Sequence, residues 1–403
     1  MNDHILALAR ENAPCYLYEY DVMKQRVGTL RQTFPQYDLL YSIKANPFPP
    51  VVRALAGLGL GADAASAPEV LLSRRCGMAK KDIFFSAAGK TDAALEAAWD
   101  ESELIADSLG EVARIGALCR RKGQRRAIGV RMNPAFGMGG GAGTSSKFGV
   151  NEEDLPQLKA LLDDLPVTVE GIHVHLKSQN LDADVLGGCY RDSWALAKRV
   201  QAALDCEMRY VNFGSGVGVA YDEGFEQPMD LAVLKTYTDA IAADNAATWK
   251  ARLMIETGRF PSAQAGTYWL RVVDKKTSRG KTYVIVENCM NGLQKPAIAA
   301  MLRHELGGAA PAPYEPLFTS DWAFPIIAHG DGGATETVDI VGNLCCAVDV
   351  LAEGFTGPRL AVGDLIEVRN AGAYACTLTA QRFSSHQPPR ELLVCGDGRT
   401  EVE

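Results

Sequence analysis

The chain of 403 residues lacks the features that would place it in a membrane, on a nucleic acid or in a secretory pathway. It has no run of about 18 uncharged apolar residues, which a membrane-spanning helix requires. Its N-terminus has no basic segment followed by an apolar run and a small-residue cleavage site. Lysine and arginine number 41 against 49 acidic residues, and the net charge of −8 argues against binding nucleic acid or an anionic membrane through bulk charge. We therefore expect a cytoplasmic protein with no nucleic-acid or membrane partner.

Spacings typical of metal sites are also missing. The ten cysteines are scattered without a Cys-x-x-Cys pair, and the only adjacent two are Cys345 and Cys346. His173 and His175 would share one face of a strand, which can suit a metal, but no third ligand with matching geometry is evident. A buried core histidine and a ring stacked on an aromatic cofactor are the other interpretations of this pair. We predict no metal site.

Short β-rich runs alternate with longer helical stretches from about residue 39 to residue 257, as in βα units around a parallel sheet. The length suffices for a barrel of about 250 residues and a second domain. Eight such strands favour a (β/α)8 barrel over an open doubly wound sheet. The predicted strands cover residues 39–43, 61–65, 83–86, 104–107, 127–132, 171–175, 210–213 and 253–256.

Chemically useful residues stand at or just past the ends of these strands, where a barrel keeps its active site. They are Lys44, Asp63, Asp107, Asn133, His175, Gly214 and Glu256. After residue 260 the pattern changes to strand-like runs separated by turns, so we expect a β-rich second domain that also takes an early strand at residues 15–20. The predicted domains are a barrel over 24–262 and a β-rich domain over 1–23 and 263–403.

Lys44 ends the first predicted strand and is followed by small residues and a proline at position 47. A lysine in this place can be partly desolvated, which lowers its pKa and makes the neutral amine available to attack an aldehyde. A solvated lysine at a strand end is the alternative interpretation. The residues at the other strand ends distinguish these two interpretations of Lys44.

A phosphate site is predicted at the last two strands. Residues 212–218 follow a strand and are rich in glycine, so their backbone N–H groups can approach a phosphate, although a tight turn has the same composition. Arg259 follows the eighth strand, and the loops after the seventh and eighth strands are the usual phosphate site of a barrel. Glu256 would reach the barrel mouth, where a carboxylate can pair with a protonated ring nitrogen. A surface ion pair between Glu256 and Arg259 is the alternative.

Together these residues offer four contacts that pyridoxal 5′-phosphate needs: an amine for its aldehyde, a carboxylate for its ring nitrogen, a ring to stack and a phosphate site. From residues 13–18 to residues 389–394 the chain resembles the barrel-type pyridoxal-phosphate decarboxylases, the family of diaminopimelate, ornithine and arginine decarboxylases, which shares its architecture with alanine racemase. The resemblance implies that Lys44 carries the cofactor, Asp63 lies near the imine, His175 stacks on the ring and Glu256 pairs with the pyridine nitrogen. It places Ser178, Gly214, Ser215, Gly216, Arg259 and Tyr374 around the phosphate.

The same resemblance implies a homodimer with shared active sites. Residues 342–349 are similar to the family's segment that reaches across the dimer interface, with Cys345 at the position of the cysteine thought to protonate the product carbanion. Tyr374 would also come from the partner. The catalytic residues expected on this basis are Lys44, His175 and Cys345.

Three positions depart from the family and concern the substrate. Cys346 stands where diaminopimelate decarboxylases have a glutamate and ornithine decarboxylases an aspartate, so the far end of the substrate is not expected to carry a simple ammonium group there. Lys295 replaces an arginine that helps to hold substrate carboxylate, and Lys177 replaces a glycine. With Phe383, these residues form the predicted substrate site. Asn212 stands where an acidic residue is usual, and the sequence gives no account of it.

Losing an acid and gaining lysines favours a substrate richer in carboxylates than diaminopimelate or ornithine. The predicted class is that of decarboxylases in carboxylate-siderophore biosynthesis, for example one acting on a citryl conjugate of 2,3-diaminopropionate. Diaminopimelate and basic amino acids stay open as substrates. An amino-acid racemase is a further alternative, but it would need a second base on the opposite face and would not use the Cys345 segment.

Overall fold

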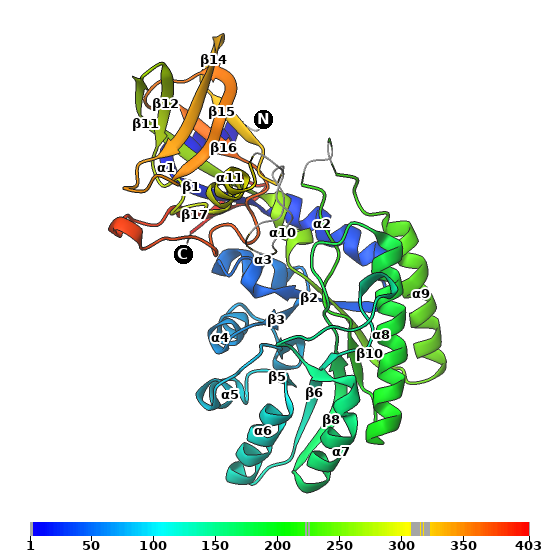
Figure 1. Cartoon of the computed structure of the whole chain (residues 1–403). Helices are drawn as coiled ribbons and strands as arrows, with labels where there is room; N and C mark the ends of the chain where they lie inside the picture. The colour runs from blue at the N-terminus through cyan, green and yellow to red at the C-terminus, as the bar shows by residue number, and fades with distance from the viewer. Residues whose placement is uncertain are drawn as a thin grey trace. The chain divides into compact units, whose positions relative to one another are not determined.

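The computed structural model describes residues 3–221, 224, 226–307, 315, 317 and 323–402 (Figure 1). Contacts within the chain divide it into two compact units. The barrel unit comprises Arg26–Val219 and Pro228–Gly258. The β unit comprises Met1–Gln25, Ala220–Gln227 and Arg259–Glu403. No helix in these described ranges is long and apolar enough to cross a membrane.

A closed ring of parallel strands forms the barrel unit, which confirms the predicted fold class. The strands pair in the order β5-β4-β3-β2-β10-β9-β8-β6, and pairing of β5 with β6 closes the ring of eight, with β7 (Val150–Asn151) attached outside it. Every predicted strand is present, although the sixth ends at His173 and leaves His175 in the following loop. The ring consists of β2 (Tyr37–Ser42), β3 (Gly61–Ala64), β4 (Ile83–Phe85), β5 (Glu103–Ala106), β6 (Arg126–Asn133), β8 (Val167–His173), β9 (Tyr210–Asn212) and β10 (Arg252–Thr257).

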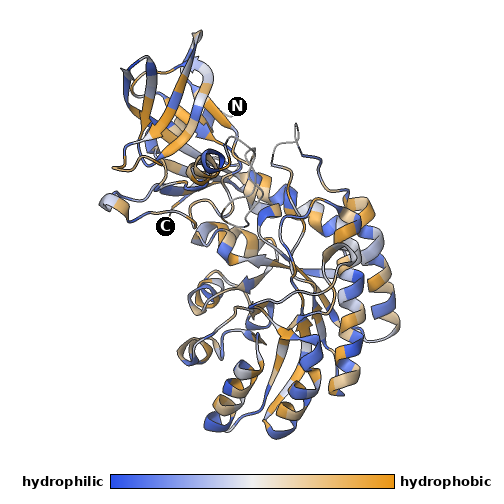
Figure 2. Ribbon diagram, viewed as in Figure 1, coloured by the Kyte–Doolittle hydropathy of each residue, from blue (hydrophilic) through white to orange (hydrophobic). Residues whose placement is uncertain are grey.

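Helices surround this ring, and several begin at a residue that suits a helix N-terminus. Ser66, Thr91, Ser108 and Asp182 each accept a hydrogen bond from a backbone N–H of the first turn that has no partner within the helix. Figure 2 shows hydrophilic and hydrophobic stretches on the same outer helices, as expected when one side packs on the strands. These helices are α3 (Pro49–Gly57), α4 (Ala67–Arg75), α5 (Asp92–Ala98), α6 (Leu109–Lys122), α7 (Leu155–Asp164), α8 (Ala183–Leu204) and α9 (Leu231–Ala247), and α2 (Tyr20–Thr33) enters the barrel unit from the β unit.

Tyr210 and its neighbours fill the interior of the barrel. Its ring joins Leu40, Phe84, Ile105 and Met254 in one buried cluster. Two glycines make room for it, because a Cβ at Gly129 would lie 2.3 Å from the Tyr210 hydroxyl and one at Gly171 would lie 2.3 Å from its ring. The interior is therefore packed, and the polar chemistry is left to the carboxyl ends of the strands.

The β unit contains a second sheet, in which strands follow the order β15-β14-β12-β11-β1-β17-β18, while β16 pairs with β11 and β13. Strands β13, β15 and β18 were not predicted; in β15 the residues Gly354, Gly357 and Pro358 obscure the strand pattern. The elements are α1 (Asp3–Asn12), β1 (Cys15–Glu19), α10 (Arg259–Ser262), β11 (Gly266–Ser278), β12 (Lys281–Val286), α11 (Lys295–Glu305), β13 (Ile326–His329), β14 (Asp331–Gly342), β15 (Val350–Arg359), β16 (Leu365–Val368), β17 (Arg390–Val394) and β18 (Thr400–Glu401).

Candidate active site

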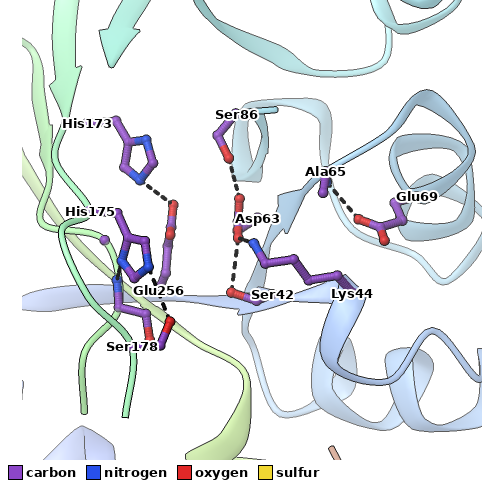
Figure 3. A network of polar contacts seen from close by, with 12 residues as sticks. Ser42, Lys44, Asp63, Ala65, Glu69, Ser86, His173, His175, Ser178 and Glu256 are labelled. Carbon is purple, nitrogen blue, oxygen red and sulfur yellow. Dashed lines mark hydrogen bonds and ion pairs between the residues drawn. The ribbon is translucent and has the colours of Figure 1, made fainter. Parts of the chain in front are cut away.

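Lys44 lies in a single 3-10 turn, Ile43–Ala45, directly after β2 (Figure 3). Its ammonium nitrogen is 2.7 Å from Oδ2 of Asp63, and its side chain is 44% exposed whereas that of Asp63 is 1% exposed. The amine of Lys44 is thus partly covered, and its partial desolvation stays a prediction. The buried carboxylate of Asp63 positions the amine.

Asp63, at the end of β3, accepts hydrogen bonds from neighbouring strand ends. Ser42 Oγ donates to its Oδ2 over 3.0 Å, and Ser86 Oγ donates to its Oδ1. Burial alone would raise the pKa of this carboxyl, but Lys44 and the Ser86 hydroxyl outweigh burial and hold the pKa well below its usual range. Sequence reasoning missed both serines; their signal was a place at the end of the strands on either side of β3.

Glu256 is buried near the end of β10, beside Asn212 of the adjacent strand β9 and His173 of the next strand, β8. Its Oε1 accepts a hydrogen bond from Asn212 Nδ2 over 2.8 Å and lies 3.2 Å from His173 Nε2. Burial and the nearby Asp63 raise the pKa of Glu256, but the lowering by His173 is part of a larger opposite effect, so the net shift is downward. Asn212 now has a structural explanation: a neutral amide can donate to this carboxylate, which an acidic residue could not do without protonation.

His175, in the loop after β8, turns its ring toward Ser178 of the same loop (Figure 3). Its Nδ1 accepts the Ser215 N–H over 3.1 Å, so this nitrogen carries no proton, and its Nε2 lies 3.3 Å from Ser178 Oγ. Burial lowers the pKa of His175 to about 4, which keeps the ring neutral near pH 7. A neutral, fixed imidazole is suited to lie against an aromatic ring.

Gly214 and Gly216 form a turn that admits no side chain. Gly214 has φ 65°, and a Cβ there would lie 2.4 Å from the carbonyl oxygen of Val174. Gly216 has φ 153°, and a Cβ there would lie 2.6 Å from Leu186. The Asn212 side chain fixes the start of the turn by accepting the Gly214 N–H over 2.9 Å. The turn thus offers backbone to a ligand at close range.

Arg131 is a further residue that sequence reasoning missed. It is 8% exposed at the end of β6, lies 3.8 Å from Asp107, and donates a long 3.4 Å hydrogen bond to the His175 carbonyl oxygen. The signal was an arginine inside an otherwise apolar strand. Its guanidinium therefore supports the loop that carries His175. Asn133 is the residue that was predicted at this strand end, and its side chain donates a hydrogen bond to Asn151 of β7 instead.

Arg259, Tyr374 and Lys295 come together in the β unit. The Arg259 guanidinium lies 4.5 Å from the centre of the Tyr374 ring, the Lys295 nitrogen lies 5.9 Å from it, and Arg259 also pairs with Glu315. Tyr374 has φ 52°, a left-handed conformation that costs a non-glycine residue about 1–3 kcal/mol and is found mostly at functional sites. The contact between Tyr374 and Arg259 forms within one chain, and the contribution of Tyr374 to the site of a partner stays a prediction.

The remaining predicted residues differ in exposure. Cys345 is exposed in the loop between β14 and β15, and Cys346 packs in part against Met290, Ala297 and Leu344. Lys177 is exposed in the barrel unit, and Phe383 is 44% exposed in a short turn of the β unit. The barrel unit thus brings together Lys44, Asp63, His175, Ser178, Gly214, Ser215 and Glu256 in one network around the strand ends.

Comparison with known proteins matches this network to a family. Residues 21–263 match the model of the pyridoxal-dependent decarboxylases, pyridoxal binding domain. An L-glutamyl-[BtrI acyl-carrier protein] decarboxylase of Niallia circulans is 29% identical over 95% of this chain and 89% of its own length. A diaminopimelate decarboxylase of Methanothermobacter thermautotrophicus is 28% identical over 96% of this chain and 88% of its own. The crystal structure of diaminopimelate decarboxylase from Helicobacter pylori complexed with L-lysine has a TM-score of 0.79 at 25% identity, covering 97% of this chain and 93% of that one.

The residues of the barrel unit fit pyridoxal 5′-phosphate. Lys44 offers the amine, His175 a neutral ring, Glu256 an ionised carboxylate, and the turn at Gly214 and Gly216 a backbone surface that a Cβ would block. These are the groups that the cofactor's aldehyde, ring, ring nitrogen and phosphate each require. Arg259 directly follows the barrel unit in the sequence and stays a predicted phosphate ligand, because a guanidinium is suited to phosphate.

Glu69, near Asp63 and Lys44, makes the stability of the fold depend on pH (Figure 3). Burial raises its pKa to about 7 from 4.5, although Glu69 accepts the Ala65 N–H over 2.6 Å. Glu69 therefore binds its proton more tightly in the folded chain than in the unfolded chain. The resulting contribution to the free energy of unfolding is complete below pH 4.5 and is lost as pH rises through 7. Glu69→Gln removes the titration, and we expect it to raise the free energy of unfolding relative to wild type at pH 8 by about 2 kcal/mol more than at pH 5. Urea unfolding at the two pH values measures this, and an equal effect at both would contradict it.

Proposed function

The chain belongs to the pyridoxal-dependent decarboxylases, and on that premise we propose that its substrate is an amino acid conjugate rich in carboxylates, such as citryl-diaminopropionate in siderophore biosynthesis. The family fixes the reaction as loss of carbon dioxide from an amino acid with pyridoxal 5′-phosphate as cofactor. The substrate is inferred from the residues of this chain that a free diamine would not need.

Lys295 carries this proposal. It is 2% exposed, and its ammonium nitrogen has no hydrogen-bond partner among the described residues. The rings of Phe324 and Tyr374 have their centres 5.7 and 5.9 Å from this nitrogen. Burial, together with the charge of Arg259, lowers the pKa of Lys295 to about 7. An ammonium group so placed is costly without an anion, and a substrate carboxylate would supply one.

Cys346 supports the same substrate class. A residue that packs against an apolar cluster offers no carboxylate to a distant ammonium group. The relative from Niallia circulans is named for a glutamyl group on a carrier protein, which is an acidic amino acid in conjugated form. Whether the conjugate here is free or attached to a carrier is left to experiment.

Diaminopimelate is the second candidate substrate. The relative from Methanothermobacter thermautotrophicus carries that name and matches nearly the whole chain. Diaminopimelate also has a second carboxylate that could meet Lys295. It differs from the proposed class in its distal ammonium group, which neither Cys346 nor Lys295 would favour.

The residues divide the chemistry among themselves. When bound, the cofactor supplies an electron sink for the electron pair left by carbon dioxide. Lys44 would hold the cofactor through its aldehyde, and Glu256 would keep a proton on the ring nitrogen. His175 would lie against the ring. Cys345 Sγ then donates a proton to the carbon that has lost carbon dioxide, and the product amine leaves with that hydrogen.

The assembly belongs to the same proposal. We infer a homodimer in which the loop with Cys345 completes the active site of the partner, because Cys345 is exposed and residues 342–349 resemble the family's segment that reaches across the dimer interface. A cytoplasmic location also stays a prediction from the sequence.

Carbon dioxide release from a matched pair of substrates tests the function. Citryl-diaminopropionate and acetyl-diaminopropionate share the reacting carbon and differ in the carboxylates of the acyl group. We expect kcat/KM to favour the citryl compound by roughly 10- to 100-fold, the scale of one hydrogen bond to a charged group. Lys295→Met should remove most of that preference through KM, and Lys295→Arg should keep it.

Three results would count against the proposal. A preference for diaminopimelate, ornithine, lysine or arginine over the citryl compound would overturn the substrate class. Exchange of enantiomers without carbon dioxide would point to a racemase instead. If Lys295→Met weakens binding of pyridoxal 5′-phosphate while KM is unchanged, Lys295 serves the cofactor phosphate rather than a substrate carboxylate.

A further inference from the structure

Asp349, in the turn between β14 and β15, fastens two separate segments of the β unit together. It is 2% exposed, and each of its carboxylate oxygens accepts a backbone hydrogen bond. Oδ1 accepts the Met290 N–H over 2.8 Å, and Oδ2 accepts the Leu344 N–H over 2.9 Å. Its own carbonyl oxygen accepts the Gly342 N–H over 2.8 Å. One aspartate therefore holds both ends of its own loop and a segment more than fifty positions earlier.

The site is built around this carboxylate. A Cβ at Gly342 would lie 1.9 Å from Asp349 Oδ2, so only glycine leaves room for the side chain there. Burial raises the pKa of the Cys289 thiol, and its hydrogen bond to Asp349 raises it further, so this thiol stays protonated as another donor. A buried carboxylate with this many donors is a fixed point of the structure.

One of the two segments carries the predicted catalytic residue Cys345, and the other leads to Lys295 of the predicted substrate site. Cys345 follows Leu344 directly, and Met290 begins the short stretch that leads to the buried Lys295. The apolar contact of Met290, Ala297 and Leu344 lies between the same segments. Asp349 thus determines where the loop with Cys345 stands relative to the segment with Lys295.

We propose that Asp349 is a positioning residue that sets the place of the Cys345 thiol. The inference rests on the proton-donor role given to Cys345 above, but not on the identity of the substrate. If one carboxylate oxygen is lost, a buried backbone N–H at Met290 or Leu344 loses its acceptor, and the loop shifts to recover one. The thiol then spends less time where the product carbon can take its proton.

Thiol alkylation measures the position of the loop without any substrate. We expect Asp349→Asn in the holoenzyme to change the rate at which iodoacetamide modifies Cys345, followed by peptide mass spectrometry, by about tenfold in either direction. Asp339→Asn is the matched control. Asp339 is a buried aspartate of the adjacent strand β14 that accepts the Gly354 N–H over 2.9 Å and pairs with Lys281, away from the loop. Equal alkylation rates in wild type and Asp349→Asn would overturn the proposal.

Turnover provides the second readout. Asp349→Asn should lower kcat roughly tenfold with little change in KM, and it should have no further effect on kcat in a Cys345→Ala background. Effects that add in the double variant would show that Asp349 acts on something other than Cys345. Gly342→Ala displaces the same carboxylate by contact and without a change in charge, so it repeats the test if Asp349→Asn fails to fold.

These results can be separated from those that test the substrate. The alkylation rate and the comparison with Cys345→Ala can be obtained with whichever amino acid the enzyme decarboxylates. A preference for diaminopimelate would leave the positioning role intact. If Cys345→Ala retains full turnover, the proton-donor role is lost and the positioning role with it.

Discussion

Lys44→Ala is expected to lower decarboxylation by at least roughly a thousandfold, the scale on which loss of a covalent catalyst acts. The amine beside Asp63 is the group that we propose takes up the cofactor's aldehyde, and it lies 2.7 Å from the Asp63 carboxylate. The variant should also lose the visible absorbance of the cofactor bound to protein. Borohydride reduction of wild type followed by peptide mapping should place the cofactor on Lys44.

Two controls separate the covalent role from the charge. Lys44→Arg keeps a cation beside Asp63 and so protects the buried carboxylate, but it cannot form the bond to the cofactor. We expect it to be folded and as inactive as Lys44→Ala. Lys198→Ala removes a lysine of equal exposure, 43% against 44%, that also pairs with an aspartate. It should keep full activity, and a Lys44→Ala enzyme that keeps it too would contradict the mechanism.

Glu256→Gln is expected to lower kcat on the order of a hundred- to a thousandfold, as loss of one preorganised charge at a reacting site does. The carboxylate is ionised because His173 lies beside it, and it would keep a proton on the ring nitrogen of the cofactor. A neutral amide cannot stabilise that proton. The measurement is carbon dioxide release at saturating substrate.

The fold should tolerate the same change. Glutamine has the shape of glutamate, can still accept from Asn212 Nδ2, and removes a negative charge that opposes Asp63. We therefore expect the thermal midpoint of Glu256→Gln to stay close to that of wild type. A variant with full kcat would show that the ring nitrogen is not Glu256's partner, and a variant that unfolds would show that the charge is structural. Glu256→Asp keeps the charge but moves it back by one methylene, so its kcat should lie between those of wild type and Glu256→Gln.

The barrel could be predicted because its strands differ clearly from their surroundings. Buried parallel strands are short and continuously apolar, and the residues that follow them are polar, so strand ends such as Lys44 and Glu256 were found from the pattern alone. Strand β15 was missed because its glycines and proline resemble a turn. Its pairing with β14 over a long hairpin depends on contacts that local sequence does not contain.

The residues that hold the reacting side chains in place were harder to predict from the sequence than the reacting side chains themselves. Ser86, Arg131 and Asn212 act through neighbours that are distant in sequence, and nothing in their local patterns indicates which carboxylate or carbonyl they meet. The exposure of Lys44 could not be predicted either, because it depends on what packs around the amine. The burial of Lys295 could not be predicted for the same reason, since the two rings near it come from separate segments.

Asn212 links Glu256 to the glycine turn after β9. One end of its amide donates to Glu256, and the other end accepts the Gly214 N–H. The amide thus acts as a spacer of fixed length between a charge and a turn. The residues that would hold the ring nitrogen and the phosphate are consequently joined through one planar group, and a change at either end would be transmitted to the other.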